Sequence, residues 1–197
     1  QLAALVQKYF SDWKGEGPRA PEPDFGDPKP DGVPTRVVVE PTLPTTVSLG
    51  YLRPWRKVDD TIVYNEQLLI DAVALQIINR RLEVQARSGG NYLFAEVAQE
   101  DISRTADATL ISVTPIADKW EAATKDVRAV IADATENAPS QADIDREKTL
   151  FANALRTMLD SYPFEAAAKQ ADDIVQAVDI RETVAAPKTV VEVYEAM

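Results

Sequence analysis

Hydrophobic positions follow a helical period in some blocks of the chain and a strand period in others. Apolar residues recur at helical spacing in residues 2–13, and Gly15 provides a stop signal. A second helical block begins at Asp59 or Asp60 and ends near Arg87. This long helix is apolar around most of its circumference, so we expect it to be largely buried against a sheet.

Four segments have the composition or alternation of β-strands. TRVVVEP is short and β-branched, whereas TTVSLGYLRPW alternates and is closed by Pro54. Two more strands are expected after the long helix, in NYLFAEVAQEDI and RTADATLISVTPIA. The strands therefore come in two pairs, one before and one after the long helix.

The last third of the chain predicts a run of three helices. Asp118 with Glu121, and Ser140 with Asp143, have the three-residue spacing of a capping box, and a further helix follows Pro163. Paired strands and grouped helices indicate an α+β domain. We expect an antiparallel or mixed sheet of about four or more strands, covered on one side by helices.

Residues 16–34 form a proline-rich connection between the first helix and the first strand. Because proline fixes φ and lacks an N–H donor, we expect this segment to be extended and to lie on the surface. A length of 197 residues fits one domain, or one large and one very small, and suffices for a hydrophobic core.

Composition excludes several kinds of chemistry. The chain has 32 Asp and Glu against 21 Lys and Arg, which argues against nucleic acid or an anionic membrane as partner, and no apolar stretch is long enough to span a membrane. It has no histidine and no cysteine, so the commonest general base and the usual zinc ligands are missing. Asp143, Asp145 and Glu147 make a small acidic cluster, but carboxylates are favoured at a helix start without any catalytic role.

Several segments occur in a familiar order. YFSDWKG, VVVEP, VSLGYLRPW, INRRLE and SQADIDREKTLF together resemble the pitrilysin/insulinase family of zinc metallopeptidases. In that family, domains of similar fold come in pairs, and one of each pair carries the zinc motif His-x-x-Glu-His. The histidine-free chain resembles the zinc-free type. The resemblance implies that residues 1–197 are a single zinc-free domain of a longer protein, beginning just after that domain's first strand.

The resemblance implies a function as well. The chain would be a non-catalytic domain of a zinc-dependent metalloendopeptidase, shaping the chamber and helping to bind peptide substrates. It would hold no cofactor itself, and its partners would be peptides and the zinc-binding domain of the same parent. Bacterial relatives are often exported, which implies a periplasmic location. The alternative is a structural homologue whose parent has no zinc site anywhere.

The same resemblance implies the candidate site. An extended peptide would add to the sheet edge at Leu93, Phe94, Ala95, Glu96 and Val97, since strand addition needs only free main-chain groups. An ordinary internal strand is the alternative.

Relatives also place an arginine and a tyrosine near the end of the long helix. The corresponding Arg87 and Tyr92 are spaced differently, so we expect them to receive peptides rather than cut them. Arg80, Arg81 and Arg87 also suit a helix C-terminus on electrostatic grounds alone. No catalytic residue and no metal ligand is expected in this chain.

Overall fold

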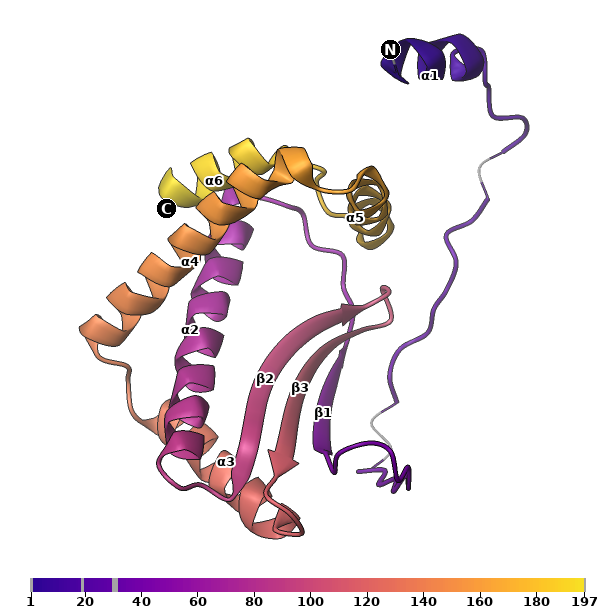
Figure 1. The fold of residues 1–197 in the computed structure, drawn as a ribbon. Coiled ribbons are helices and arrows are strands. Elements are labelled where there is room, and N and C mark those ends of the chain that lie inside the picture. The colour runs from indigo at the N-terminus through magenta and orange to yellow at the C-terminus, as the bar shows by residue number, and fades with distance from the viewer. Residues whose placement is uncertain (1, 19, 30–31, 197) are drawn as a thin grey trace.

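A computed structural model describes residues 2–18, 20–29 and 32–196, which form an α+β structure (Figure 1). The α+β class expected from the sequence is therefore confirmed. The elements in chain order are α1 (Leu2–Phe10), β1 (Val47–Pro54), α2 (Ile62–Arg87), β2 (Tyr92–Ile102), β3 (Ala106–Pro115), α3 (Trp120–Glu136), α4 (Gln141–Ser161), the 3-10 helix η1 (Tyr162–Phe164), α5 (Ala167–Ile180) and α6 (Pro187–Ala196).

The strands of the described residues form one three-stranded antiparallel sheet in the order β1-β3-β2. β3 is central, and its Val113 lies opposite Val47 of β1 and Ala95 of β2. This sheet is smaller than the expected one of about four or more strands. β1 and β2 are both edge strands in the part of the chain that the structure describes.

The missing strand is the one predicted in TRVVVEP. Val37, Val38 and Val39 are about 85% exposed (86%, 85% and 84%) and pair with no strand among the described residues. Proline at positions 34 and 41 brackets this short run, and a turn follows at once, with Leu43 N–H bonded to Glu40 C=O at 3.1 Å. β-branched composition alone does not make a strand where proline removes donors and no partner is in place.

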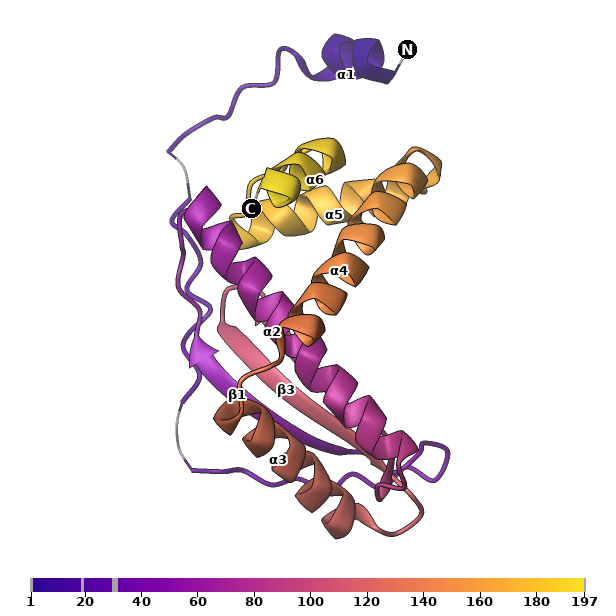
Figure 2. The same cartoon turned by 90° about the vertical axis from the view of Figure 1, so that its left-hand side faces the viewer.

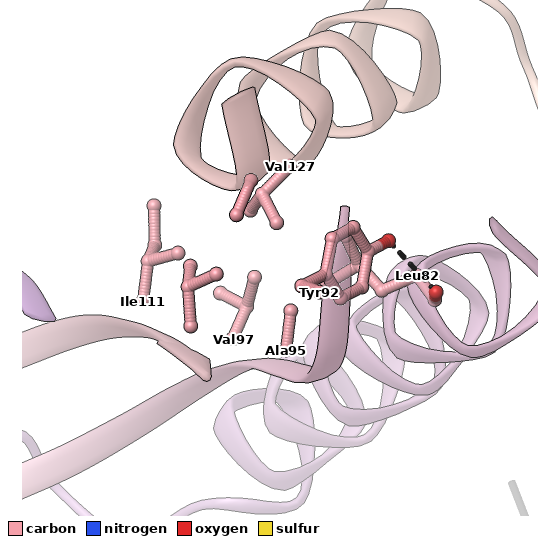
Figure 3. Close-up of a cluster of buried hydrophobic side chains, with 8 residues drawn as sticks. Leu82, Tyr92, Ala95, Val97, Ile111 and Val127 are labelled. Atoms are coloured by element: carbon pink, nitrogen blue, oxygen red, sulfur yellow. Dashed lines mark hydrogen bonds between the residues drawn. The ribbon is translucent and has the colours of Figure 1, made fainter. Parts of the chain in front are cut away.

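The core lies between one face of the sheet and the helices α2 and α3 (Figure 2). It is built from alternate residues of the strands, because successive strand residues point to opposite faces. Figure 3 shows the cluster, in which α3 contributes Val127 and α2 contributes Leu82. Its buried members are Leu82, Tyr92, Ala95, Val97, Ile111, Val113, Ala123 and Val127.

Helix α2 is less buried than its sequence suggests. Ile77 and Leu82 are its buried residues, whereas Val63 is 74% exposed and Ile70 is 60% exposed. The first half of α2 extends beyond the sheet toward α4 and α6 (Figure 2). Several apolar residues of that half, namely Ile62, Leu68, Leu69 and Ala72, line an open cavity rather than a packed core.

The helix starts agree with the sequence at one position and differ at two. Ser140 and Asp143 form the expected capping box of α4. The expectation of Asp59 or Asp60 as the cap of α2 is wrong, because Thr61 Oγ1 accepts the hydrogen bond from Tyr64 N. The second expectation, Asp118 as the cap of α3, is also wrong. Asp118 lies in a turn, and Lys119 precedes the helix without a side-chain cap.

The arginines near the end of α2 attach neighbouring helices. Arg80 forms an ion pair with Glu147 of α4, whose side chain is only 4% exposed. Arg146 approaches the same carboxylate at 3.2 Å, and Arg81 pairs with Asp133 of α3 at 3.2 Å. Two of the three arginines therefore fasten α4 and α3 to α2, whereas Arg87 lies in the last turn, where a positive charge suits the helix terminus.

Part of the proline-rich connection is anchored to the folded body. Arg104 at the β2–β3 turn pairs with Glu22 at 3.2 Å and with Asp179 at 3.1 Å, and its guanidinium lies 4.6 Å from the centre of the Phe25 ring. Asp27 pairs with Arg56 at 3.1 Å. We call residues 22–27 the strap.

Helix α1 lies beyond the strap, apart from the other helices (Figures 1 and 2). Its apolar side chains are exposed, with Tyr9 at 61% and Phe10 at 49%, and so is Trp13 just after the helix, at 75%. The helical period of residues 2–13 therefore produces an amphipathic helix whose apolar face is not covered by the described residues.

The core tyrosine predicts a loss of stability at alkaline pH. Burial, together with the charge of Asp126, raises the pKa of Tyr92 from 10.0 to about 12. The folded state thus holds this proton more tightly than the unfolded state does. The stabilisation is complete below about pH 10 and is lost as pH rises toward about 12, amounting to about 2–3 kcal/mol.

Urea unfolding between about pH 9 and about pH 12 measures this loss. Tyr92→Phe should be less stable than the parent near pH 9, by about 1 kcal/mol for the lost hydrogen bond. Near pH 12 the order should reverse. Parallel pH profiles for the two proteins would contradict the assignment.

Candidate functional site

The turn between α2 and β2 is fixed by a glycine pair. Ser88 caps α2, Gly89 N–H bonds to Ala86 C=O at 3.4 Å, and Gly90 N–H bonds to Gln85 C=O at 3.0 Å. This is the Schellman pattern that ends many helices. Gly89 has φ +95°, and a Cβ on Gly90 would lie 2.9 Å from Gln85 O, so both positions require glycine.

Arg87 is an exposed surface residue at this turn. Its side chain is 79% exposed and pairs with Glu83, one turn earlier, at 2.5 Å. A pair at this spacing on a helix surface stabilises it by only about 0.3–0.5 kcal/mol. Arg87 is therefore accessible to a ligand, and its weak partner does little to hold it in place.

Tyr92 lies in the core. Its side chain is 1% exposed, and its hydroxyl donates a hydrogen bond of 2.8 Å to Leu82 C=O of the last turns of α2 (Figure 3). The neighbouring turn is held as well, because Asp126 of α3 accepts hydrogen bonds from the backbone and side-chain nitrogens of Asn91. A peptide at the sheet edge would therefore not contact the Tyr92 ring.

The five strand residues of the candidate site face opposite sides of the sheet. Ala95 and Val97 point into the core, whereas Leu93 is 69% and Phe94 is 55% exposed, and Glu96 is exposed too. The pairing with β3 is irregular between Tyr92 and Phe94, which places Leu93 at a bulge. The structure thus brings two apolar side chains and one carboxylate to the outer surface of β2.

The outer edge of β2 is partly occupied by a side chain of α2. Asn79 Nδ2 donates to Val97 C=O at 3.0 Å, and Asn79 Oδ1 accepts from Val97 N–H at 2.8 Å. An asparagine amide therefore takes the two main-chain groups that a neighbouring strand would otherwise take. The candidate edge is closed at Val97 by its own molecule.

The outward main-chain groups of Ala95 and Gln99 remain available for pairing with an added strand. Residues two apart along a strand direct their N–H and C=O groups to the same side, so these groups face the same edge as those of Val97. No partner outside the β2–β3 pairing is found for them among the described residues. Within the predicted segment of residues 93–97, Ala95 is the position where an added strand finds unpaired main-chain groups.

Sequence reasoning missed Asn79. It lies within an apolar helical stretch, where its side chain has no local signal of a long-range role. Its position explains why the amide is there: a half-buried polar group on a helix that packs beside a strand edge needs partners, and Val97 supplies both. Only the packing of α2 against β2 reveals the pair.

The described residues contain no cluster of three or more histidine, cysteine or carboxylate side chains arranged to hold a metal ion. Nor does any helix in the described part of the chain have the length and apolar character needed to cross a membrane.

The solved structures that this chain matches include proteases. The chain matches the periplasmic protease PqqL of Escherichia coli with a TM-score of 0.71 over 98% of this chain, at 16% identity. It matches a predicted insulinase family protease of Yersinia pestis with a TM-score of 0.70 over 99% of this chain, also at 16% identity. The first half of PqqL matches 77% of this chain, with a TM-score of 0.65 and 12% identity.

These comparisons establish the fold. The chain shares it with insulinase-family proteases, which confirms the resemblance seen in the sequence at the level of the fold. The chain spans 22% of the PqqL structure, 32% of its first half and 42% of the Yersinia protein. No protein-family model and no curated protein matches the sequence.

The Asn79 bridge gives a prediction for stability. Asn79→Ala removes both hydrogen bonds to Val97 and should lower the free energy of unfolding by about 1–3 kcal/mol. Urea unfolding checks this value. Gln85→Ala, an exposed change on the same helix, should cost less than about 0.5 kcal/mol. Equal effects of the two substitutions would show that the Asn79 bridge contributes nothing.

Proposed function

We propose that this chain is a non-catalytic domain of a zinc-dependent metalloendopeptidase, where it shapes the chamber and helps to hold peptide substrates. The observation that carries the proposal is the match to insulinase-family proteases over 98% and 99% of this chain. The sequence has neither histidine nor cysteine, so the zinc would be bound elsewhere in the parent protein.

Peptide binding would use the edge of β2. An extended peptide pairs with the outward N–H and C=O groups of Ala95, in the manner of strand addition. The exposed Leu93 and Phe94 side chains offer apolar contacts beside it. Because the Asn79 amide occupies the main-chain groups of Val97, the peptide would pair with the first part of β2 and not beyond Val97.

Catalysis would take place outside this chain. A zinc ion in the neighbouring domain would polarise a water molecule for attack on the peptide carbonyl, while this domain positions the substrate. Arg87, exposed at the turn that precedes β2, would attract carboxylate groups of arriving peptides. PqqL is a periplasmic protease, and we propose export for this protein on that likeness.

Strand addition can be tested with a pair of peptides that differ only in their main chain. The first is an acetylated and amidated dodecapeptide of alanine, serine and threonine with a central valine. The second has the same sequence, with alternate amide nitrogens methylated. The chain should bind the first at least about tenfold more tightly, because each lost main-chain hydrogen bond costs about 1 kcal/mol. Fluorescence anisotropy of labelled peptides measures both affinities.

Two further results belong to the same experiment. The chain with added zinc should leave the peptide uncut, and hydrogen exchange at the Ala95 amide should slow when the peptide binds. Zinc-dependent hydrolysis by this chain alone would contradict the non-catalytic role. Equal binding of the two peptides would contradict strand addition, and no binding of either would favour a structural domain.

A further inference from the structure

A second potential binding site lies at the end of the molecule opposite the dense core. The first half of α2, helices α4 and α6 and the loop between α5 and α6 surround a cavity of about 640 Å³ (Figure 2 shows these elements). This volume is in the range of ligand sites in proteins. Its walls are largely apolar and include Leu68, Leu69, Ala72, Phe151, Leu155 and Val190.

One polar atom in the wall has no partner. The Tyr194 ring packs against Phe151, with ring centres 5.0 Å apart, and its hydroxyl is buried without a hydrogen bond to any described residue. A buried hydroxyl without a partner lowers the stability of the folded state.

Carboxylates gather at the mouth of the cavity. Asp60 accepts hydrogen bonds from Thr183 N and Asn65 Nδ2, and Asp101 accepts one from Trp55 Nε1 at 2.6 Å. Glu182 lies beside them, and its carboxylate lacks such partners among the described residues.

No hydrogen bond or ion pair joins the Glu182 carboxylate to a described residue. Burial raises the pKa of Glu182, and the negative charges of Asp60 and Asp101 raise it further. Burial also raises the pKa of Tyr64 in the cavity wall. The negative charges of the surrounding carboxylates raise this pKa further.

Carboxylates of the strap pair with the positive charges at this mouth. Arg56 and Arg181 both line the cavity, but Arg56 is paired with Asp27 at 3.1 Å and Arg181 with Glu22 at 2.5 Å. Each arginine therefore has a carboxylate partner from outside the cavity, and Arg181 shares Glu22 with Arg104. The charge left without a counterion at the mouth is negative, and Glu182 is its accessible part.

We propose that this cavity binds a lysine or arginine side chain of a peptide, with the aliphatic stem on the apolar wall and the cationic head against Glu182. A long basic side chain combines the two properties that the cavity requires, because its methylene stem packs on apolar surface while its charge remains at the mouth. The inference rests on the proposed function in taking a peptide as the ligand. The cavity includes Asp101 near the end of β2 but none of residues 93–97, so the two sites can be tested independently.

The experiment compares two blocked pentapeptides, Ser-Leu-Lys-Ser-Ala and the same sequence with Nε-acetyl-lysine, which keeps the stem and removes the charge. Calorimetry at low ionic strength should show about fivefold tighter binding of the lysine peptide, as expected for exchanging a charged for a neutral hydrogen bond. Glu182→Gln should abolish this preference. Glu136→Gln, an equal change of charge at the end of α3, should leave it intact.

Ala72→Phe places a ring in the cavity and should abolish binding of both pentapeptides, with thermal unfolding confirming that the variant is folded. Equal affinities of the two peptides would overturn the proposal, as would equal losses from Glu182→Gln and Glu136→Gln. None of these substitutions touches β2, so failure here leaves the strand-addition test unaffected.

Discussion

The attachment of α2 to β2 is the constraint on which the rest of the structure depends. Two contacts set it: the Tyr92 hydroxyl on Leu82 C=O, and the Asn79 amide on the main chain of Val97. They fix both the position and the rotation of α2 beside the sheet. Since Arg80 and Arg81 lie on the same turns of α2, this rotation also decides where α4 and α3 can be attached.

The two halves of α2 have different surroundings as a result. Its second half packs against strands and α3, where Leu82, Val113 and Val127 are almost fully buried. Its first half stands clear of the sheet and is surrounded by helices that leave a hollow. The dense end supplies stability, whereas the hollow end keeps apolar surface and an unpaired carboxylate available to a ligand.

Much of the fold could be predicted from the sequence, because local patterns determine it. β2, β3 and the end of α2 follow from side-chain alternation and from Gly89 and Gly90, whose conformations depend on near neighbours. The segment TRVVVEP failed as a strand because strand formation needs a partner, which composition does not report. The partial exposure of α2 was missed for a related reason: an apolar helix can face a cavity as readily as a core.

The candidate site was harder to predict than the fold. The position of β2 at a sheet edge, and the exposure of Leu93 and Phe94, depend on the strand order, which no local pattern encodes. The burial of Tyr92 depends on the contact with α2. The Asn79–Val97 bridge joins residues 18 positions apart through a polar side chain that carries no signal of its own.

The same bridge affects how copies of the protein behave toward one another. An exposed strand edge is a template for pairing with an identical edge, and chains that pair in this way can assemble without limit. By filling the middle of the β2 edge with a side chain, Asn79 prevents two molecules from joining into one continuous sheet there. No side chain of the described residues bonds to the β1 edge in this way, but that strand contains Gly50, Arg53 and Pro54, which are poorly suited to extending a sheet. Both edges therefore carry features that oppose pairing between copies, while a short opening is left at Ala95.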